Sequence, residues 1–307
     1  MSYRCAKRFS PRANISHLPA QNSILKPRGL PPCLRNTLGK SSAARKMLFL
    51  MSDYEERFGG IGRLFAVEGL QRLRRAHVAV IGIGGVGSWA VEALARFGIG
   101  ELTLIDLDEV CVSNVNRQLH AMDGEIGKSK VEVMARRAQA INPECLVHPL
   151  NVFFTEANAQ EILSVRFDYV LDAIDSLSKK CLLIAACHGK NIPIITVGAA
   201  GGRRDPSAIQ VADLAKATND RLLRETRSKL RGRHGFPRGE KKFNVDCVFS
   251  TEAVAYPRKD GSVCAQPEPG TDLHLNCNSG FGTASFVTGT FGFVAAAHIV
   301  KKISGAV

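Results

Sequence analysis

The first 52 residues of this 307-residue chain contain no aspartate or glutamate, although they carry ten lysine and arginine residues. They have no apolar periodicity, and they lack the apolar core of a secretory signal. A basic segment that buries little apolar surface stays unfolded, so we expect residues 1–52 to be a disordered extension. Residues 1–50 are either an organelle transit peptide or upstream sequence read through from a wrong start. The stretch MSDYEERFGG from Met51 resembles an ordinary protein start and favours the second alternative.

Paired cysteines are also missing. The nine cysteines are scattered, their number is odd, and no Cys-x-x-Cys sequence occurs. A disulfide framework is untypical of a chain this long, and a structural zinc site would need the missing ligand spacing. We therefore expect reduced thiols in a cytoplasmic protein, and no zinc.

Excess charge is nearly absent outside the extension. The formal net charge is +13, and ten of these charges lie in residues 1–52. Within the almost neutral remainder, residues 203–242 hold twelve basic and five acidic side chains. Charge this local indicates a patch rather than a property of the whole fold, so we expect a basic insertion at about residues 203–243.

One uncharged run, FGTASFVTGTFGFVAAAHIV at residues 281–300, is close to the length of a membrane span. It is rich in glycine, threonine and serine, and it contains His298. These residues favour a buried C-terminal helix that closes the core. We expect no integral membrane role, and membrane association through this run is the alternative.

Short apolar runs alternate with amphipathic stretches from residue 76 to residue 201, and no internal repeat occurs. The expected strands are residues 77–83, 101–108, 145–152, 168–175 and 192–199, and the expected helices are residues 86–98, 127–143 and a stretch through 179–190. This alternation predicts an α/β fold with a doubly wound, mostly parallel Rossmann-like sheet. Runs of valine, isoleucine and leucine are typical of strands buried on both faces. Further along, we expect a strand at residues 208–215, a partly helical basic segment at 218–242 and a polar loop at 258–280.

A glycine-rich turn separates the first expected strand from the first expected helix. Its glycines are Gly82, Gly84, Gly85 and Gly87. The missing side chains let the backbone turn sharply and approach a phosphate, and the helix N-terminus adds free N–H groups. Asp106 ends the next expected strand, where a carboxylate can bind ribose hydroxyls. These features predict a nucleotide site and leave NAD and ATP both open.

Charged residues downstream favour ATP. The stretch DLDEVCVSNVNRQLH contains two aspartates, a Ser-Asn pair and an Arg-Gln pair, and GKSKVEV places Lys128 and Lys130 on the first turn of a helix. Asp172 and Asp175 follow at the carboxyl end of a strand, where open parallel sheets bind ligands. Hydride transfer does not need this array. Attack of a carboxylate on the α-phosphate of ATP does, because negative charge develops on the phosphate and on pyrophosphate.

Arg117 and Lys130 can neutralise that charge, and Asp175 can hold the Mg²⁺ that bridges phosphate oxygens. Taken singly, each residue has a simpler interpretation. Arg117 can be a surface ion pair, and Lys130 can be a solvated helix residue. We expect Asp172 to cap the following helix rather than to act in catalysis. Taken together and in this order along the chain, these charged residues indicate the function more specifically than the glycines alone.

The motifs Gly-x-Gly-Gly-x-Gly, DxDxVxxSNxxRQ, GxxKxE and DAIDS resemble the ThiF-type adenylating superfamily, which is related to ubiquitin-activating enzymes. The resemblance spans residues 57–307, and it implies that residues 53–307 form one ATP-binding adenylating domain in a homodimer. The roles that it implies by position are ribose binding for Asp106, with Asp108 beside it, phosphate contacts for Asn114, Arg117 and Lys130, and magnesium placement for Asp175.

Two further residues carry implied roles. Arg63, in GIGRL, matches the arginine that reaches in from the partner subunit in the superfamily, with a different spacing here. Cys247, in VDCVFS, lies near the position where relatives have a reactive cysteine. The alternative for Cys247 is a core thiol, because no histidine or lysine stands immediately beside it in the sequence.

Within the superfamily, the sequence is most similar to the tRNA threonylcarbamoyladenosine dehydratases. The similarity rests on stretches such as RFGGIGRL, NRQLHA, IQVADLAK and VDCVFSTEAVAYP. It implies adenylation of the threonine carboxylate of a modified adenosine beside the tRNA anticodon, followed by cyclisation with net loss of water. ATP and Mg²⁺ are the implied cofactors, and a monovalent cation is left open. A cysteine desulfurase and its sulfur acceptor are implied partners.

A tRNA substrate is a polyanion, and clustered basic side chains can follow its backbone. The candidates are Arg221, Arg224, Arg227, Lys229, Arg231 and Arg233. The alternative for this segment is a solvated, mobile loop. Three other functions remain open: an activating enzyme for a ubiquitin-like sulfur carrier, an NAD-dependent oxidoreductase and a non-catalytic tRNA-binding protein. Sulfur-carrier activators usually contain two Cys-x-x-Cys zinc pairs, so their absence argues against the first.

Overall fold

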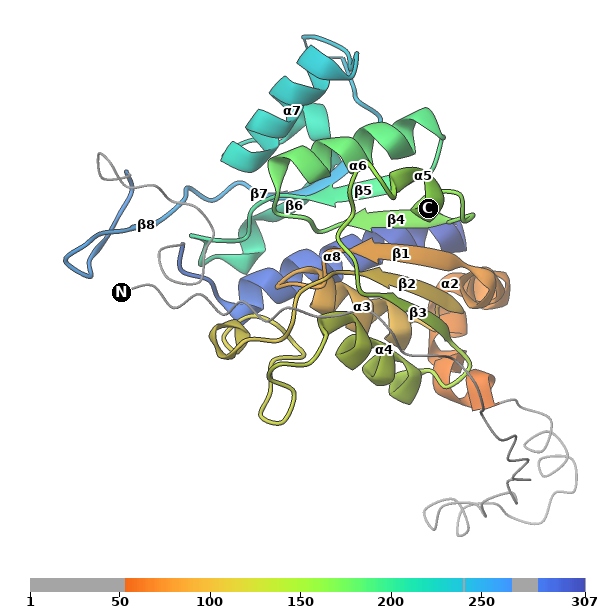
Figure 1. The fold of residues 1–307 in the computed structure, drawn as a ribbon. Helices are drawn as coiled ribbons and strands as arrows, with labels where there is room; N and C mark the ends of the chain where they lie inside the picture. The colour runs from red at the N-terminus through yellow and green to blue at the C-terminus, as the bar shows by residue number, and fades with distance from the viewer. Residues whose placement is uncertain (1–52, 240, 267–280, 307) are drawn as a thin grey trace, which may run out of the picture. The chain divides into compact units, whose positions relative to one another are not determined.

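The computed structural model describes residues 53–239, 241–266 and 281–306 (Figure 1). The expected disordered extension, residues 1–52, lies outside the described residues, and so do residues 267–280 of the expected polar loop.

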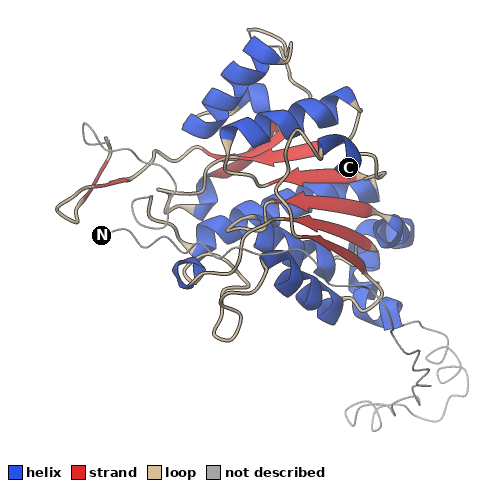
Figure 2. Ribbon diagram, in the orientation of Figure 1, coloured by secondary structure: helices blue, strands red, loops and turns tan. Residues whose placement is uncertain are grey.

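Helices and strands alternate along the chain (Figure 2). The helices are α2 (Asp53–Arg75), α3 (Gly87–Arg96), α4 (Lys130–Ile141), α5 (Ala159–Ile162), α6 (Leu177–Gly189), α7 (Arg221–Arg233) and α8 (Ser285–Ser304). The strands are β1 (His77–Ile81), β2 (Glu101–Ile105), β3 (Leu146–Leu150), β4 (Tyr169–Asp172), β5 (Ile194–Val197), β6 (Ile209–Asp213), β7 (Asp246–Ser250), β8 (Tyr256–Pro257) and β9 (Val263–Cys264). The sequence predicts β1 to β6, α3, α4, α6 and α8, and a partly helical segment where α7 lies. It does not predict α2, α5, β7 or the β8–β9 hairpin.

The main sheet of the described residues has the strand order β3-β2-β1-β4-β5-β7-β6. β6 runs antiparallel to β7, and the other neighbouring strands are parallel. The chain winds from β1 to β3 in one direction and from β4 to β7 in the other, so the predicted doubly wound, mostly parallel fold is confirmed. The order reverses between β1 and β4, where such a sheet forms a crevice at the carboxyl ends of its strands.

Helices cover both faces of the sheet (Figure 1). α3, α4 and α8 enclose one apolar core, which contains Leu94, Met134 and Phe291, and α5, α6 and α7 enclose the other, which contains Leu183 and Leu223. β1, β4 and β5 are buried along their whole length, as their apolar runs predict. β3 is mostly exposed because it forms an edge of the sheet.

The uncharged run at residues 281–300 forms most of α8. Among the described helices, α8 is the one whose length and composition would allow it to cross a membrane. Half of its most apolar window is nevertheless buried inside the fold, where it packs against α3 and α2. This packing supports the expected helix that closes the core.

The expected basic insertion is an ordered part of the fold. Its first half contributes β6 to the sheet, and its second half forms α7. Asp220 caps α7 by accepting a hydrogen bond from the backbone N–H of Leu223 at 2.9 Å. Leu223 and Leu230 recur at helical spacing and are buried. The alternative of a mobile loop is therefore wrong for residues 221–233.

Gly292 marks a close approach of α8 to α3. A Cβ atom at this position would lie 2.7 Å from the carbonyl oxygen of Val86 and 2.8 Å from Cβ of Trp89. We expect Gly292→Ala to lower the free energy of unfolding by about 1–3 kcal/mol in urea denaturation, because the added methyl group overpacks this contact. The control is Gly232→Ala in α7, where nothing lies within 4 Å of the added Cβ and where alanine should stabilise the helix. Equal tolerance of the two changes would show that the helices are not closely packed.

Candidate nucleotide-binding site

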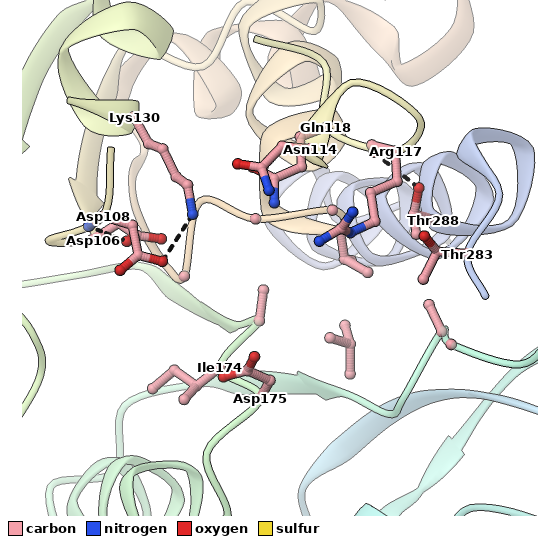
Figure 3. A pocket seen from close by; sticks show the side chains of 18 of the residues that line it. Asp106, Asp108, Asn114, Arg117, Gln118, Lys130, Ile174, Asp175, Thr283 and Thr288 are labelled. Carbon is pink, nitrogen blue, oxygen red and sulfur yellow. Dashed lines mark hydrogen bonds and ion pairs between the residues drawn. The ribbon is translucent and has the colours of Figure 1, made fainter. Parts of the chain in front are cut away.

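A cleft of about 830 Å³ opens at the carboxyl ends of β1, β2 and β4 (Figure 3). It therefore lies where the strand order reverses. Its lining includes Gly84, Asp106, Arg117, Lys130 and Asp175. Figure 3 shows Lys130 and Arg117 on one side, with Asp175 across the cleft from them. The fold thus gathers the charged residues that the sequence predicts, although they are spread along the chain.

The glycines of the turn between β1 and α3 have two separate tasks. Gly82 has a φ of +93°, and a Cβ there would lie 2.7 Å from the carbonyl oxygen of Ala173. At Gly87, a Cβ would overlap the carbonyl oxygen of Gly82. Gly82, Gly84 and Gly85 line the cleft. α3 then begins with no side-chain cap and no acidic residue in its first turn, so its positive end is suited to an anion.

Asp106 fixes this turn from the end of β2. Its Oδ2 accepts the backbone N–H of Ile83 at 2.6 Å, and its Oδ1 accepts the backbone N–H of Asp108 at 2.9 Å. Burial raises the pKa of the Asp106 carboxyl above its usual value, although the nearby Lys130 ammonium acts in the opposite direction. The side chain holds the glycine turn and also lines the cleft, where it can accept hydrogen bonds from ribose hydroxyls.

Lys130 is the first residue of α4, and it is only 5% exposed. Its Nζ lies 2.8 Å from Oδ2 of Asp108, whose side chain is 55% exposed. The interpretation of Lys130 as a solvated helix residue is therefore wrong. Lys128 precedes α4 rather than lying in its first turn, and it pairs with Glu125 at 3.1 Å. Only the second of the two lysines lines the cleft.

Arg117 follows a short 3-10 helix, Val112–Asn114, on the same side of the cleft. Its guanidinium donates to the carbonyl oxygen of Ser113 at 2.7 Å. Its own carbonyl oxygen accepts from Nε1 of Trp89 at 3.0 Å and from Oγ1 of Thr288 at 3.1 Å. α3 and α8 therefore hold the backbone of this arginine. Arg117 has no ion pair with any described residue, so the surface ion pair that the sequence left open does not form.

Two buried amides complete this side of the cleft. Oδ1 of Asn114 accepts the backbone N–H of Cys111 at 3.1 Å. Gln118 is 7% exposed, and its Oε1 has no hydrogen-bond partner among the described residues. The sequence analysis assigned no role to Gln118, although it directly follows Arg117 in the motif. An unpartnered buried acceptor in the lining of the cleft marks it as a further candidate contact for a ligand.

Asp175 reaches the cleft from the loop that follows β4, and it is exposed. The loop is fixed from below, because Oδ1 of Asp172 accepts the backbone N–H of Ile174 at 3.0 Å. Lys179, which the sequence analysis did not single out, also lines the cleft, and its Nζ lies 3.7 Å from the centre of the Phe153 ring. No local sequence pattern indicates that contact.

The expectation that Asp172 caps the following helix is wrong. Ser176 stands at the N-cap of α6, whereas Oδ2 of Asp172 lies 2.8 Å from Nζ of Lys180. The side chains of Asp172 and Lys180 are both 0% exposed. Oγ1 of Thr196 donates to the same carboxylate oxygen at 2.6 Å. A charge pair that is fully withdrawn from water is stable only because each partner is satisfied by the other.

His120 supports the glycine turn from behind. It is fully buried, and its Nε2 lies 2.8 Å from the carbonyl oxygen of Ile83. A carbonyl oxygen can only accept, so the hydrogen of this imidazole is on Nε2. Burial lowers the pKa of His120 below its usual value, which keeps the ring neutral at pH 7.

Two expected residues do not line the cleft that the described residues form. Arg63 is exposed on α2. Cys247 lies in β7 and is 0% exposed, and burial raises the pKa of its thiol well above the usual value. A reactive cysteine needs a lowered thiol pKa and access to its substrate, so the structure favours the core-thiol alternative.

The six basic residues of α7 also lie outside the lining of the cleft. The exposed ones are Arg221, Arg224 and Arg233, and the partly buried ones are Arg227, Lys229 and Arg231. Nζ of Lys229 donates to Oγ of Ser178 at 2.8 Å, and Nε of Arg231 donates to the carbonyl oxygen of Pro237 at 3.1 Å. The partly buried residues thus help to hold α7 and its C-terminal loop in place.

The cleft combines a helix N-terminus, the cations Arg117, Lys130 and Lys179, and the carboxylate of Asp175 opposite Arg117 and Lys130. The cations and the helix N-terminus can neutralise a polyphosphate, and the carboxylate can hold a divalent metal ion bound to it. This arrangement suits phosphate chemistry better than hydride transfer, which leaves such a set of charges without a role.

The ThiF family model matches residues 60–306. The tRNA threonylcarbamoyladenosine dehydratase of Haemophilus influenzae is 50% identical to this chain over 254 residues, which cover 82% of this chain and 95% of the relative. The match therefore includes nearly the whole relative.

Two solved structures of the Escherichia coli tRNA N6-threonylcarbamoyladenosine dehydratase are also similar. The complex with ATP has a TM-score of 0.73 and 47% identity, and it covers 83% of this chain and 97% of the other. The complex with AMP has a TM-score of 0.74 and 48% identity, with the same coverage. The fold and the sequence thus match an enzyme whose solved structures contain ATP and AMP.

Lys180→Met should test the buried ion pair below the cleft, because it leaves the carboxylate of Asp172 buried without a cation. We expect the free energy of unfolding to fall by about 3–5 kcal/mol in urea denaturation. The double variant Lys180→Met/Asp172→Asn should recover part of this loss, because asparagine removes the buried charge and can still accept from Ile174. Equal losses in the single and double variants would mean that the charge pair does not hold this region.

Proposed function

This chain belongs to the ThiF family, and from that premise we propose that it is an ATP-dependent enzyme that dehydrates and cyclises N6-threonylcarbamoyladenosine in tRNA. The observation that carries the proposal is the gathering of Arg117, Lys130 and Asp175 around the glycine turn, in a chain half identical to dehydratases of this kind. Residues 53–307 are the proposed adenylating domain.

ATP is proposed to lie with its phosphates over Gly84 and Gly85, at the N-terminus of α3. Its ribose then lies beside Asp106, at the end of the neighbouring strand. This placement follows from the missing side chains at the turn and from the positive end of the helix. Asn114 and Gln118 offer amide groups on the same side of the cleft.

In the first step, an oxygen of the threonine carboxylate attacks the α-phosphorus of ATP. A bond from phosphorus to this oxygen forms, the bond to the bridging oxygen breaks, and pyrophosphate leaves. Arg117 and Lys130 offset the negative charge that develops. Lys130 must exchange Asp108 for a phosphate oxygen, and this exchange costs little because Asp108 is largely exposed to water.

Asp175 fits the role of a magnesium ligand. Mg²⁺ in nucleotide sites is held by one or two carboxylates together with substrate phosphates, and Asp175 is an exposed carboxylate that faces the two cations. When bound, the ion would supply further neutralisation of charge at the phosphate oxygens. A monovalent cation remains an open part of the proposal.

In the second step, the carbamoyl group of the same side chain attacks the activated carbonyl carbon. The bond from this carbon to the phosphate oxygen breaks, AMP leaves with the former carboxylate oxygen, and an N–H proton of the carbamoyl group passes to solvent. The nucleoside thereby loses the elements of water, and ATP has become AMP and pyrophosphate. Neither of the two proposed steps needs a nucleophile from the enzyme. The full burial of Cys247 is compatible with this route.

The proposed assembly is a homodimer in which Arg63 of one subunit enters the cleft of the other. Arg63 is exposed on α2, and its neighbours Leu64 and Val67 are 70% and 65% exposed. Apolar side chains this exposed support a surface that another subunit covers.

The exposed Arg221, Arg224 and Arg233 of α7 are the proposed contacts for the tRNA backbone. A cytoplasmic location and an association with a cysteine desulfurase and its sulfur acceptor complete the proposal. These last two points rest on the family resemblance alone.

Pyrophosphate release in the presence of ATP and Mg²⁺ tests the function. We expect release to depend on tRNA that carries N6-threonylcarbamoyladenosine, and the nucleoside should lose the mass of one water. A Gly-Gly-ended sulfur carrier should not replace the tRNA. Release driven by the carrier alone would favour the sulfur-carrier alternative, and binding of NAD without binding of ATP would favour an oxidoreductase.

In the same assay, Lys130→Met should lower kcat by about 10²–10³-fold, because it removes one preorganised cation from the transition state. Lys128→Met is the matched control, because this lysine lies outside the lining of the cleft. Retained tRNA binding by the inactive Lys130→Met variant would also argue against a protein that only binds tRNA. An unchanged kcat would remove Lys130 from the proposed mechanism.

Cys247→Ala should leave kcat for cyclisation within about twofold of the wild type, because the thiol takes no part in the proposed steps. We expect a modest loss of stability, since the change removes a buried sulfur. Cyclisation that fails while the protein remains folded, as judged by circular dichroism, would instead make the thiol a nucleophile.

A further inference from the structure

The amino-terminal ends of β1 and β2 and the middle of β3 carry a second cluster of polar side chains, at the opposite edge of the sheet from the cleft. Among the described residues, His77, Glu101 and His148 form the one group of histidine, cysteine or carboxylate side chains whose possible ligand atoms all lie within 4.8 Å of one another. Oε1 of Glu101 lies 3.5 Å from Nδ1 of His77 and 2.8 Å from Nε2 of His148.

Strand register brings these side chains together. His77 is aligned with Glu101, and Thr103 is aligned with His148. Side chains two residues apart in a strand point to the same face, so Glu101 and Thr103 share a face with both histidines. The three strands therefore present two imidazoles and a carboxylate at one place, near the exposed edge strand β3.

The hydrogen bond of His77 orients its ring so that the possible ligand atoms face one another. Nε2 of His77 lies 2.8 Å from Oγ1 of Thr103, which leaves Nδ1 facing the carboxylate of Glu101. When Nε2 carries the hydrogen, Nδ1 and the carboxylate oxygen present lone pairs to each other, and a cation between them removes the repulsion.

We propose that His77, Glu101 and His148 bind a divalent transition-metal ion, for which Zn²⁺ is the best match to the ligands. Two imidazoles and one carboxylate are a known protein ligand set for Zn²⁺, with a fourth position open to water. Bonds of about 2.0–2.1 Å in a tetrahedral site place neighbouring ligand atoms about 3.3 Å apart. The observed separations of 3.5 and 2.8 Å to Glu101 lie on either side of this value, so small rotations of the exposed side chains can close the site.

This site differs from the magnesium position proposed for Asp175. Mg²⁺ prefers oxygen ligands, whereas imidazole favours zinc and its transition-metal neighbours. The expectation of no zinc rested on the missing cysteine pairs. Strand register brings histidine and glutamate ligands together without any such pair. A bound ion would join β3 to β2 and β1, and so would fasten the exposed edge of the sheet.

The test is a titration of the full chain, stripped of metal and without ATP, with Zn²⁺ against a chromogenic chelator. We expect one bound equivalent that a large excess of Mg²⁺ does not displace. Glu101→Gln and His148→Gln should each weaken binding by at least about tenfold, because each removes a ligand. His234→Gln is the matched control, since His234 is exposed at the end of α7 and far in sequence from the cluster.

Co²⁺ gives a second measurement. Co²⁺ in place of Zn²⁺ should produce visible d–d absorption in the wild type and the control, without the intense near-ultraviolet band of thiolate ligands. This absorption should disappear in His148→Gln. Zinc binding that is equally strong in all variants, a thiolate band, or a lack of binding would overturn the proposal and would leave Glu101 and His148 as an ion pair. Since ATP is absent, none of these outcomes depends on the proposed dehydratase function.

Discussion

The contact between Asp172 and Lys180, fully withdrawn from water, is the constraint on which the rest of the site depends. It joins the end of β4 to α6, and Thr196 adds β5 to the same contact. The free oxygen of Asp172 then fixes the loop that carries Asp175. Because either charge alone would be costly at this depth, the chain adopts the one arrangement in which both are satisfied. Across the cleft, Asp106 fixes the glycine turn in the same way, through the backbone of Ile83.

The two edges of the sheet have different chemistry for a simple topological reason. The loops that follow β1 and β4 run in opposite directions at the point where strand order reverses, so they leave a cleft in which backbone N–H groups and cations can face a phosphate. At the amino-terminal edge, side chains of β1, β2 and β3 meet directly across neighbouring strands. An adenylating reaction suits the first edge, and a compact metal site suits the second.

Local sequence patterns were sufficient for the fold and for most of the cleft. The alternation of apolar runs predicts the sheet, and the glycine turn and Asp106 stand at fixed positions after their strands, so their location follows once the strands are known. The role of Asp172 could not be predicted, because its partner Lys180 becomes buried only when α6 packs on the sheet. α2 escaped prediction because it bends at Phe65 and Ala66, where the backbone leaves helical geometry. The cluster around Glu101 depends on register between strands, which no single segment encodes.

α8 contributes to the candidate site through the backbone of Arg117. The carbonyl oxygen of Arg117 is held by Trp89 from α3 and by Thr288 from α8. The strands of the main sheet all precede α8 along the chain, so this second anchor forms only where α8 packs against α3. The position of an arginine in the cleft therefore depends on a helix that lies far from it in the sequence.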